Sequence, residues 1–168
     1  MLIFLIGMMG SGKTTLGKQL AQELNYSFID LDTYIEQQEH TSISEIFEKQ
    51  GQDNFRKLER NALEVIAHEQ TNAIIATGGG APCFYNNIDF MNQHGTTVFL
   101  NVPIPEILKR LLSTDLTLRP LLSKKTEDEI FYFLNKTLNE RMQFYSRAKY
   151  IVKSKHITVD QLKITLNN

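Results

Sequence analysis

Eight consecutive residues near the start of the chain have the spacing of a phosphate-binding loop. Gly7 to Thr14 reads Gly-Met-Met-Gly-Ser-Gly-Lys-Thr and matches the pattern G-x-x-x-x-G-K-[ST]. The glycines let the backbone curl so that its N–H groups point at phosphate oxygens, and the N-terminus of a following helix adds positive potential. We expect Lys13 to bridge the β- and γ-phosphates of ATP, and Thr14 to offer its hydroxyl to Mg²⁺. The alternative is a glycine-rich turn that only packs a helix on a strand, and it leaves Lys13 poorly placed.

Two aspartates follow the second apolar segment of the chain. The segment 26–32 reads as a strand, and Asp30 and Asp32, two residues apart on extended chain, are expected to point the same way. One carboxylate could hold a metal-bound water while the other accepts a hydrogen bond from a substrate hydroxyl. Asp32 could equally be the N-cap of the following helix.

Three consecutive glycines and two arginines could complete an acceptor site. A run such as Gly78, Gly79 and Gly80 costs backbone entropy and is typical of places where a ligand approaches the main chain closely, although a tight turn would also explain it. Arg56 and Arg141 could hold a substrate carboxylate by paired hydrogen bonds, or they could be solvated charges on helix faces.

A polar segment at about 112–126 is expected to form a mobile lid. It contains Arg119, which precedes Pro120. A closing lid could bring the positive charge of Arg119 to the phosphoryl group during transfer and exclude water from it. The expected nucleotide-binding residues are therefore Gly10, Ser11, Gly12, Lys13, Thr14, Thr15 and Arg119.

Strands that alternate with helices must position these groups. Short apolar runs predict strands at 2–6, 26–32, 73–77, 96–102 and 150–152. Apolar residues at helical spacing, with their stop signals, predict helices at 13–24, about 32–38, 42–51, 53–70, 105–113, 128–147 and 158–166. This order indicates an α/β fold of three layers, of the P-loop NTPase type, with a central five-stranded parallel sheet flanked by helices. In such sheets ligands bind beyond the carboxyl ends of the strands, where the glycine loop, the aspartates and the triple glycine all fall.

Length and composition narrow the class of protein. The 168 residues carry a formal net charge of -1 and are 42% hydrophobic, which suits one domain, 1–168, with a normal core and no basic field for nucleic acid or an acidic membrane. Cys83 is the only cysteine, so an intramolecular disulfide or a thiolate metal site is excluded. No apolar run approaches the roughly 18 residues of a membrane span. We expect a cytoplasmic monomer that acts on small molecules.

Taken in order, these motifs resemble those of the shikimate kinase family over essentially the whole chain, and this resemblance implies a fold like that of nucleoside monophosphate kinases. Five separated motifs correspond: the glycine loop, Asp-x-Asp at 30–32, Phe-Arg-x-x-Glu at 55–59, the triple glycine at 78–80, and Glu-Arg-x-x-x-Tyr at 140–145, with Arg-Pro-Leu at 119–121 in the lid. The resemblance implies that Asp30 organises Mg²⁺ through a water and that Asp32 contacts the shikimate hydroxyl, either as a base or as an orienting group. Arg56 and Arg141 are implied to bind the carboxylate of shikimate, with a substrate-binding region at about 32–60.

The implied reaction is transfer of the γ-phosphoryl group of ATP to the 3-hydroxyl of shikimate, a step of chorismate and aromatic amino acid biosynthesis. Lys13, Asp32 and Arg119 are the implied catalytic residues, and Gly78, Gly79 and Gly80 line the acceptor through their backbone. Arg110 is the candidate for stacking on adenine.

Three other functions compete with this one. Another P-loop kinase could act on a sugar acid such as gluconate or on a nucleoside monophosphate, but the latter needs a second base site that the sequence does not show. A regulatory module that only binds ATP would not need an acceptor pocket built from Asp32, Arg56 and Arg141. A purely structural interaction domain leaves the glycine loop unexplained.

Overall fold

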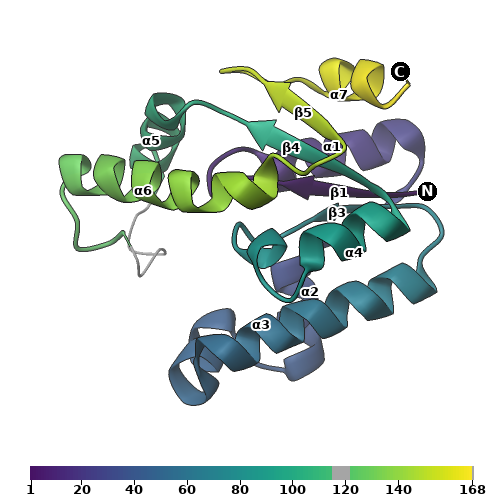
Figure 1. Cartoon of the computed structure of the whole chain (residues 1–168), viewed down its shortest axis with the longest axis horizontal. Coiled ribbons are helices and arrows are strands. Elements are labelled where there is room, and N and C mark those ends of the chain that lie inside the picture. Colours follow the sequence, from purple (N-terminus) through teal and green to yellow (C-terminus); the bar gives the residue numbers. More distant parts are fainter. Residues whose placement is uncertain (115–121, 168) are drawn as a thin grey trace.

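Five parallel strands form the central sheet (Figure 1). The computed structural model describes residues 1–114 and 122–167. The strands are β1 (Leu2–Ile6), β2 (Ser27–Asp30), β3 (Ala73–Ala76), β4 (Thr96–Asn101) and β5 (Tyr150–Lys153). They lie side by side in the order β2-β3-β1-β4-β5, and every neighbouring pair is parallel. The predicted five-stranded parallel sheet is therefore confirmed.

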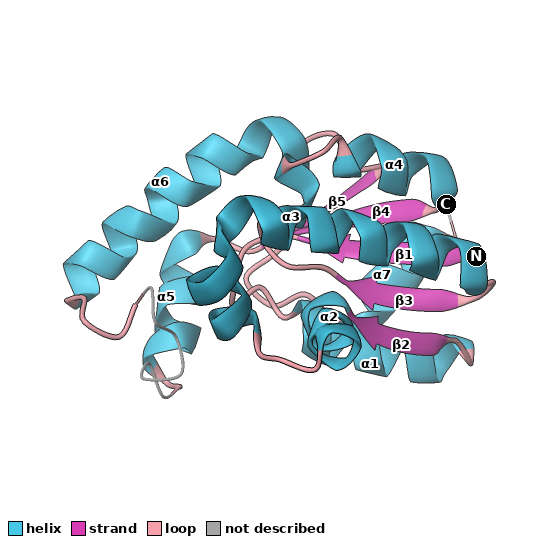
Figure 2. Cartoon of the chain, turned by 90° about the horizontal axis from the view of Figure 1, so that it is seen from below, coloured by secondary structure: helices cyan, strands magenta, loops and turns pink. Residues whose placement is uncertain are grey.

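Helices cover both faces of this sheet (Figure 2). They are α1 (Lys13–Leu24), α2 (Leu31–Glu39), α3 (Ile43–Glu69), α4 (Asn87–His94), α5 (Ile104–Leu112), α6 (Glu127–Tyr145) and α7 (Val159–Leu166). Helices α1 and α7 pack on one face and α4 on the other, while α3 lies along α4, and α5 packs against α6. None of the helices in the described part of the chain is long and apolar enough to cross a membrane.

Local sequence signals explain where these elements begin and end. Strands β1 and β3 are buried along their whole length, as expected for apolar runs covered on both faces of a parallel sheet. Capping boxes open α3, α6 and α7, where Ser42, Thr126 and Thr158 accept hydrogen bonds from backbone N–H groups of the first turn. Gly51 interrupts α3 with φ 79° and ψ 170°, a backbone region open almost only to glycine, so the two predicted helices at 42–51 and 53–70 follow one another across a kink.

Two details differ from the sequence predictions, and a third cannot be compared with them. Strand β2 ends at Asp30 rather than at residue 32, and Asp32 lies in the first turn of α2. The two aspartates are therefore not side by side on extended chain. Helix α4 and a 3₁₀ turn at Ala81–Cys83, labelled η1, were not expected as elements. The predicted lid at 112–126 lies partly outside the described residues, and Arg119 with it.

The join between α4 and β4 offers a test of the packing. A Cβ atom added to Gly95 would lie 2.5 Å from the backbone oxygen of Leu2 and 2.9 Å from a ring carbon of Phe4. We expect Gly95→Ala to lower the free energy of unfolding in urea by about 1–3 kcal/mol, because the buried end of β1 must shift. Gln93→Ala, an exposed change on the same helix, should stay within about 0.5 kcal/mol. Equal effects of the two substitutions would show that this join is not tightly packed.

Candidate active site

The glycine loop runs from β1 into α1 and curls around the side chain of Lys13. Gly10 and Gly12 have φ of 73° and 97°, backbone conformations that residues with side chains rarely adopt. The ammonium group of Lys13 donates hydrogen bonds to the carbonyl oxygens of Gly7 and Met8, both at 2.8 Å. Ser11 is buried, and its hydroxyl oxygen has no hydrogen-bond partner among the described residues. The loop thus has the cradle shape and the positive charge that a chain of phosphates requires.

Thr14 and Asp30 are brought together from two different elements. Thr14 is in the first turn of α1, and its hydroxyl donates a 2.8 Å hydrogen bond to a carboxylate oxygen of Asp30 at the end of β2. Asp30 is also the N-cap of α2, where its other oxygen lies 3.4 Å from the backbone nitrogen of Thr33. This hydroxyl and carboxylate are hard oxygen donors, which fit Mg²⁺ bound to substrate phosphates and to waters.

Asp32 and Glu59 are two carboxylates that approach the first residue of the triple glycine. A Cβ atom on Gly78 would lie 2.8 Å from Oε1 of Glu59 and 3.0 Å from Oδ1 of Asp32. Both oxygens are buried and have no hydrogen-bond partner among the described residues. Burial raises the pKa of Asp32, and the nearby charge of Asp30 raises it further, while Lys13 opposes the shift.

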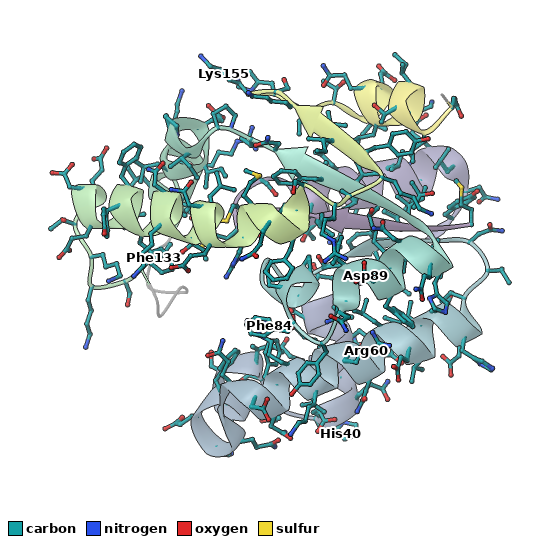
Figure 3. All side chains as sticks on the ribbon, in the orientation of Figure 1. His40, Arg60, Phe84, Asp89, Phe133 and Lys155 are labelled. Carbon is teal, nitrogen blue, oxygen red and sulfur yellow. The ribbon has the colours of Figure 1, made fainter. Side chains whose placement is uncertain are left out.

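Arg56 and Glu59 form a buried ion pair one turn apart on α3. The guanidinium group also lies over the ring of Phe84, 4.5 Å from its centre, and Figure 3 shows Phe84 between η1 and α3. A Cβ atom on Gly80 would lie 2.5 Å from a nitrogen of Arg56. Burial raises the pKa of Glu59 to about 7, although the charge of Arg56 opposes the rise. Because the pair sits where a side chain on Gly80 would clash, the glycine makes room for the arginine.

Arg141 reaches the middle residue of the triple glycine from α6. A Cβ atom on Gly79 would lie 2.8 Å from Nη1 of Arg141 and 3.3 Å from the carbonyl oxygen of Gly7. One helical turn later, the hydroxyl of Tyr145 donates a 2.6 Å hydrogen bond to the carbonyl oxygen of Gly79. Arg56 and Arg141 therefore come to the same three glycines from separate helices.

A cleft of about 320 Å³ lies between the glycine loop, the two aspartates and the first two residues of the triple glycine, and Arg56, Glu59 and Arg141 are not among its lining residues. It is lined by Met9, Gly10, Gly12, Lys13, Thr14, Thr15, Asp30, Asp32, Thr77, Gly78 and Gly79. Most of the residues predicted to bind nucleotide thus share one cavity with both aspartates and two of the three glycines. Met9 and Thr77 line the cleft although no role was predicted for them, and the place of Thr77 directly before the glycines is the signal that could have pointed to it. Glu59, also without a predicted role, lies outside this lining and approaches Gly78; its i+3 spacing from Arg56 is the only sequence signal for it.

Arg110 lies beside the glycine loop. Its guanidinium group pairs with Glu106 at 2.9 Å and donates hydrogen bonds to the carbonyl oxygens of Gly10 at 3.3 Å and of Lys155 at 2.7 Å. Lys155, labelled in Figure 3, belongs to the segment that follows β5. Arg110 therefore joins the loop to that segment, and its stacking on adenine stays a prediction.

Comparison with known proteins relates the chain that forms this cleft to one family. The family model described as shikimate kinase matches residues 9–165. A shikimate kinase of Bacteroides thetaiotaomicron is 52% identical over 149 residues, which cover 89% of this chain and 84% of that protein. A crystal structure of shikimate kinase from the same species superposes with a TM-score of 0.94 at 44% identity, over 99% of this chain and 98% of the other. The structure of shikimate kinase from Acinetobacter baumannii in complex with shikimate superposes with a TM-score of 0.85 at 32% identity, over 99% of this chain and 90% of the other.

The buried carboxyl group of Glu59 should make stability depend on pH. Its pKa of about 7 lies above the ordinary 4.5, so the folded protein binds this proton more tightly than the unfolded chain. The resulting stabilisation is complete below pH 4.5 and is lost as the pH rises through 7, by at most about 3 kcal/mol. We expect Glu59→Gln to reduce the fall in unfolding free energy between pH 5 and pH 8, measured in urea. Identical slopes in the two proteins would place the pKa of Glu59 near its ordinary value.

Proposed function

The chain belongs to the shikimate kinase family and transfers the γ-phosphoryl group of ATP to the 3-hydroxyl of shikimate, and on this premise we propose which residues perform the transfer. The observation that carries the assignment is the convergence of Asp32, Arg56 and Arg141 on a triple glycine beside a phosphate loop. A nucleotide-binding module without an acceptor has no use for that convergence. The product belongs to the biosynthesis of chorismate and the aromatic amino acids.

On the donor side, the glycine loop holds the phosphates of ATP. Backbone N–H groups of residues 10–15 bind phosphate oxygens, and Lys13 turns from its loop carbonyls to the β- and γ-phosphates. The hydroxyl of Thr14, and Asp30 through a water, would hold Mg²⁺, which would supply charge neutralisation for the phosphates. Arg119, from the predicted lid at 112–126, adds positive charge to the leaving and transferring groups.

On the acceptor side, Asp32 orients the attacking hydroxyl. Asp32 lines the cleft beside Gly78, where its carboxylate would accept a hydrogen bond from that hydroxyl. The raised pKa of Asp32 also makes it a better acceptor of the hydroxyl proton as the oxygen–phosphorus bond forms. The transition state of phosphoryl transfer is loose. Holding the attacking hydroxyl oxygen in line with the leaving oxygen of ADP is therefore the larger part of the role of Asp32.

Two arginines hold the carboxylate of shikimate at the opposite end of the acceptor. Arg141 approaches Gly79 and Arg56 approaches Gly80, so one carboxylate between them would contact both guanidinium groups. The ion pair with Glu59 orients the buried guanidinium group of Arg56. A substrate with one carboxylate and several hydroxyls suits this arrangement better than a second nucleotide does.

We also propose the setting in which the chain works. A single sheet carries all the described residues of the cleft, which supports one catalytic domain, 1–168. The proposed working state of this domain is a monomer. The formal net charge of -1 favours free small molecules over nucleic acid or an anionic membrane surface, and the cytoplasm supplies them.

The acceptor and the role of Asp32 can be tested together. Purified protein is supplied with ATP and Mg²⁺ and offered shikimate, quinate, gluconate or a nucleoside monophosphate, and ADP release is measured. We expect rapid turnover with shikimate, and a loss of kcat of about 10²- to 10⁴-fold in Asp32→Asn. Turnover with gluconate instead would be consistent with a P-loop kinase but would rule out shikimate as its acceptor. ATP binding without turnover on any acceptor would support a regulatory module.

Replacing the guanidinium group of Arg141 should change mainly the KM for shikimate. Lysine keeps the charge but loses the paired hydrogen bonds, so Arg141→Lys should raise the KM for shikimate by about 10- to 100-fold and leave the KM for ATP within about twofold. Arg147→Lys is the matched control, because Arg147 is exposed and pairs with Asp89 away from the cleft. An unchanged KM for shikimate in Arg141→Lys would remove this residue from the carboxylate site.

A further inference from the structure

Tyr145 is a buried residue that the reaction described above does not use. It ends α6, its side chain has no exposed surface, and its ring lies 4.8 Å from that of Phe99, centre to centre. The hydroxyl donates its hydrogen bond to the carbonyl oxygen of Gly79 at 2.6 Å and also lies 3.9 Å from the sulfur of Met8 in the phosphate loop. A phenylalanine would fill the same volume, so packing alone does not account for the hydroxyl.

Gly79 is the point at which the donor and acceptor sides meet. The position of a Cβ atom on this residue is 2.8 Å from the guanidinium of Arg141, 3.3 Å from the carbonyl oxygen of Gly7 and 3.7 Å from the backbone nitrogen of Met9. Gly79 has no side chain with which to anchor itself. Its place between the phosphate loop and Arg141 therefore depends on what its backbone groups bind.

Helix α6 carries both Arg141 and Tyr145, four residues apart and therefore on one face. The helix that presents the guanidinium group is thus bonded to the peptide against which that group lies. We propose that Tyr145 is a positioning residue, whose hydroxyl holds the Gly79 peptide and thereby fixes Arg141 and the bound carboxylate relative to the phosphate loop. This inference rests on the proposed function, because it requires Arg141 to bind the carboxylate of the acceptor.

The chemistry of the phenol suits this role. Burial raises the pKa of Tyr145 to about 12, although the charge of Arg141 opposes the rise. The hydroxyl is therefore protonated, and able to donate, throughout the pH range of ordinary assays. In Tyr145→Phe the carbonyl oxygen of Gly79 loses this donor while the ring contact with Phe99 is retained.

The test compares Tyr145→Phe with Tyr132→Phe, which removes a hydroxyl from an exposed tyrosine of the same helix. Loss of one hydrogen bond predicts a three- to tenfold rise in the KM for shikimate in Tyr145→Phe, with the KM for ATP within about twofold, and no change in Tyr132→Phe. KM does not depend on the fraction of active protein, so the measurement stands even if the variant is less stable. A lower melting temperature with an unchanged KM for shikimate would reduce Tyr145 to a structural role and overturn the inference.

A second measurement asks whether Tyr145 acts through Arg141. In the Arg141→Lys background, Tyr145→Phe should raise the KM for shikimate by less than twofold, because the group that it positions has been replaced. If the two substitutions instead multiplied the KM for shikimate independently, the inference would be overturned while the assignment as a shikimate kinase would stand. Wild-type protein that fails to phosphorylate shikimate would instead overturn the proposed function itself, so the two failures are distinguishable.

Discussion

Four ionisable side chains pack against the three consecutive glycines, in space that a side chain at these positions would fill, and the active site depends on this packing. Asp32 and Glu59 approach Gly78, Arg141 approaches Gly79, and Arg56 approaches Gly80. Removing charges from water costs several kcal/mol per ion unless they are paired. The Arg56–Glu59 pair meets this requirement inside the protein, whereas Asp32 keeps a buried oxygen without a partner among the described residues. Substrate hydroxyls and a carboxylate are the groups that would complete the set.

The topology of the sheet brings these charges to one edge. All five strands are parallel, so their carboxyl ends face the same way, and the central β1 carries the phosphate loop. Its neighbour β3 leads into the glycines, and β2 beyond it ends at Asp30. Donor and acceptor sides therefore follow strands that lie close together, and the helices α3 and α6 need only deliver the arginines. This is the general place for ligands in open α/β sheets.

The sequence predicts the parts of this site that depend on local chemistry. Continuous apolar runs and a glycine pattern of fixed spacing identify β1, its loop and the sheet. The strand predicted over residues 31 and 32 was wrong because the apolar Leu31 reads as a strand residue, whereas it is buried as the first residue of α2, with Asp30 as the cap. Helix α4 is short, and only Ile88, Met91 and Asn87 are buried in it, which leaves little periodic signal. The i+3 spacing of Arg56 and Glu59 indicates a charge pair, but such pairs are common on exposed helices, and only tertiary burial makes this one a buried pair.

The central position of β1 also affects the order in which the protein can fold during its synthesis on the ribosome. The loop is made first, but the two strands that flank β1 are β3 and β4, which are synthesised long after it. The nascent loop therefore waits, without its sheet, through many seconds of translation at about 5–20 residues per second. Arg141 and Tyr145 follow later still. A growing chain consequently adds the strands on both sides of its glycine loop before it adds Arg141 and Tyr145.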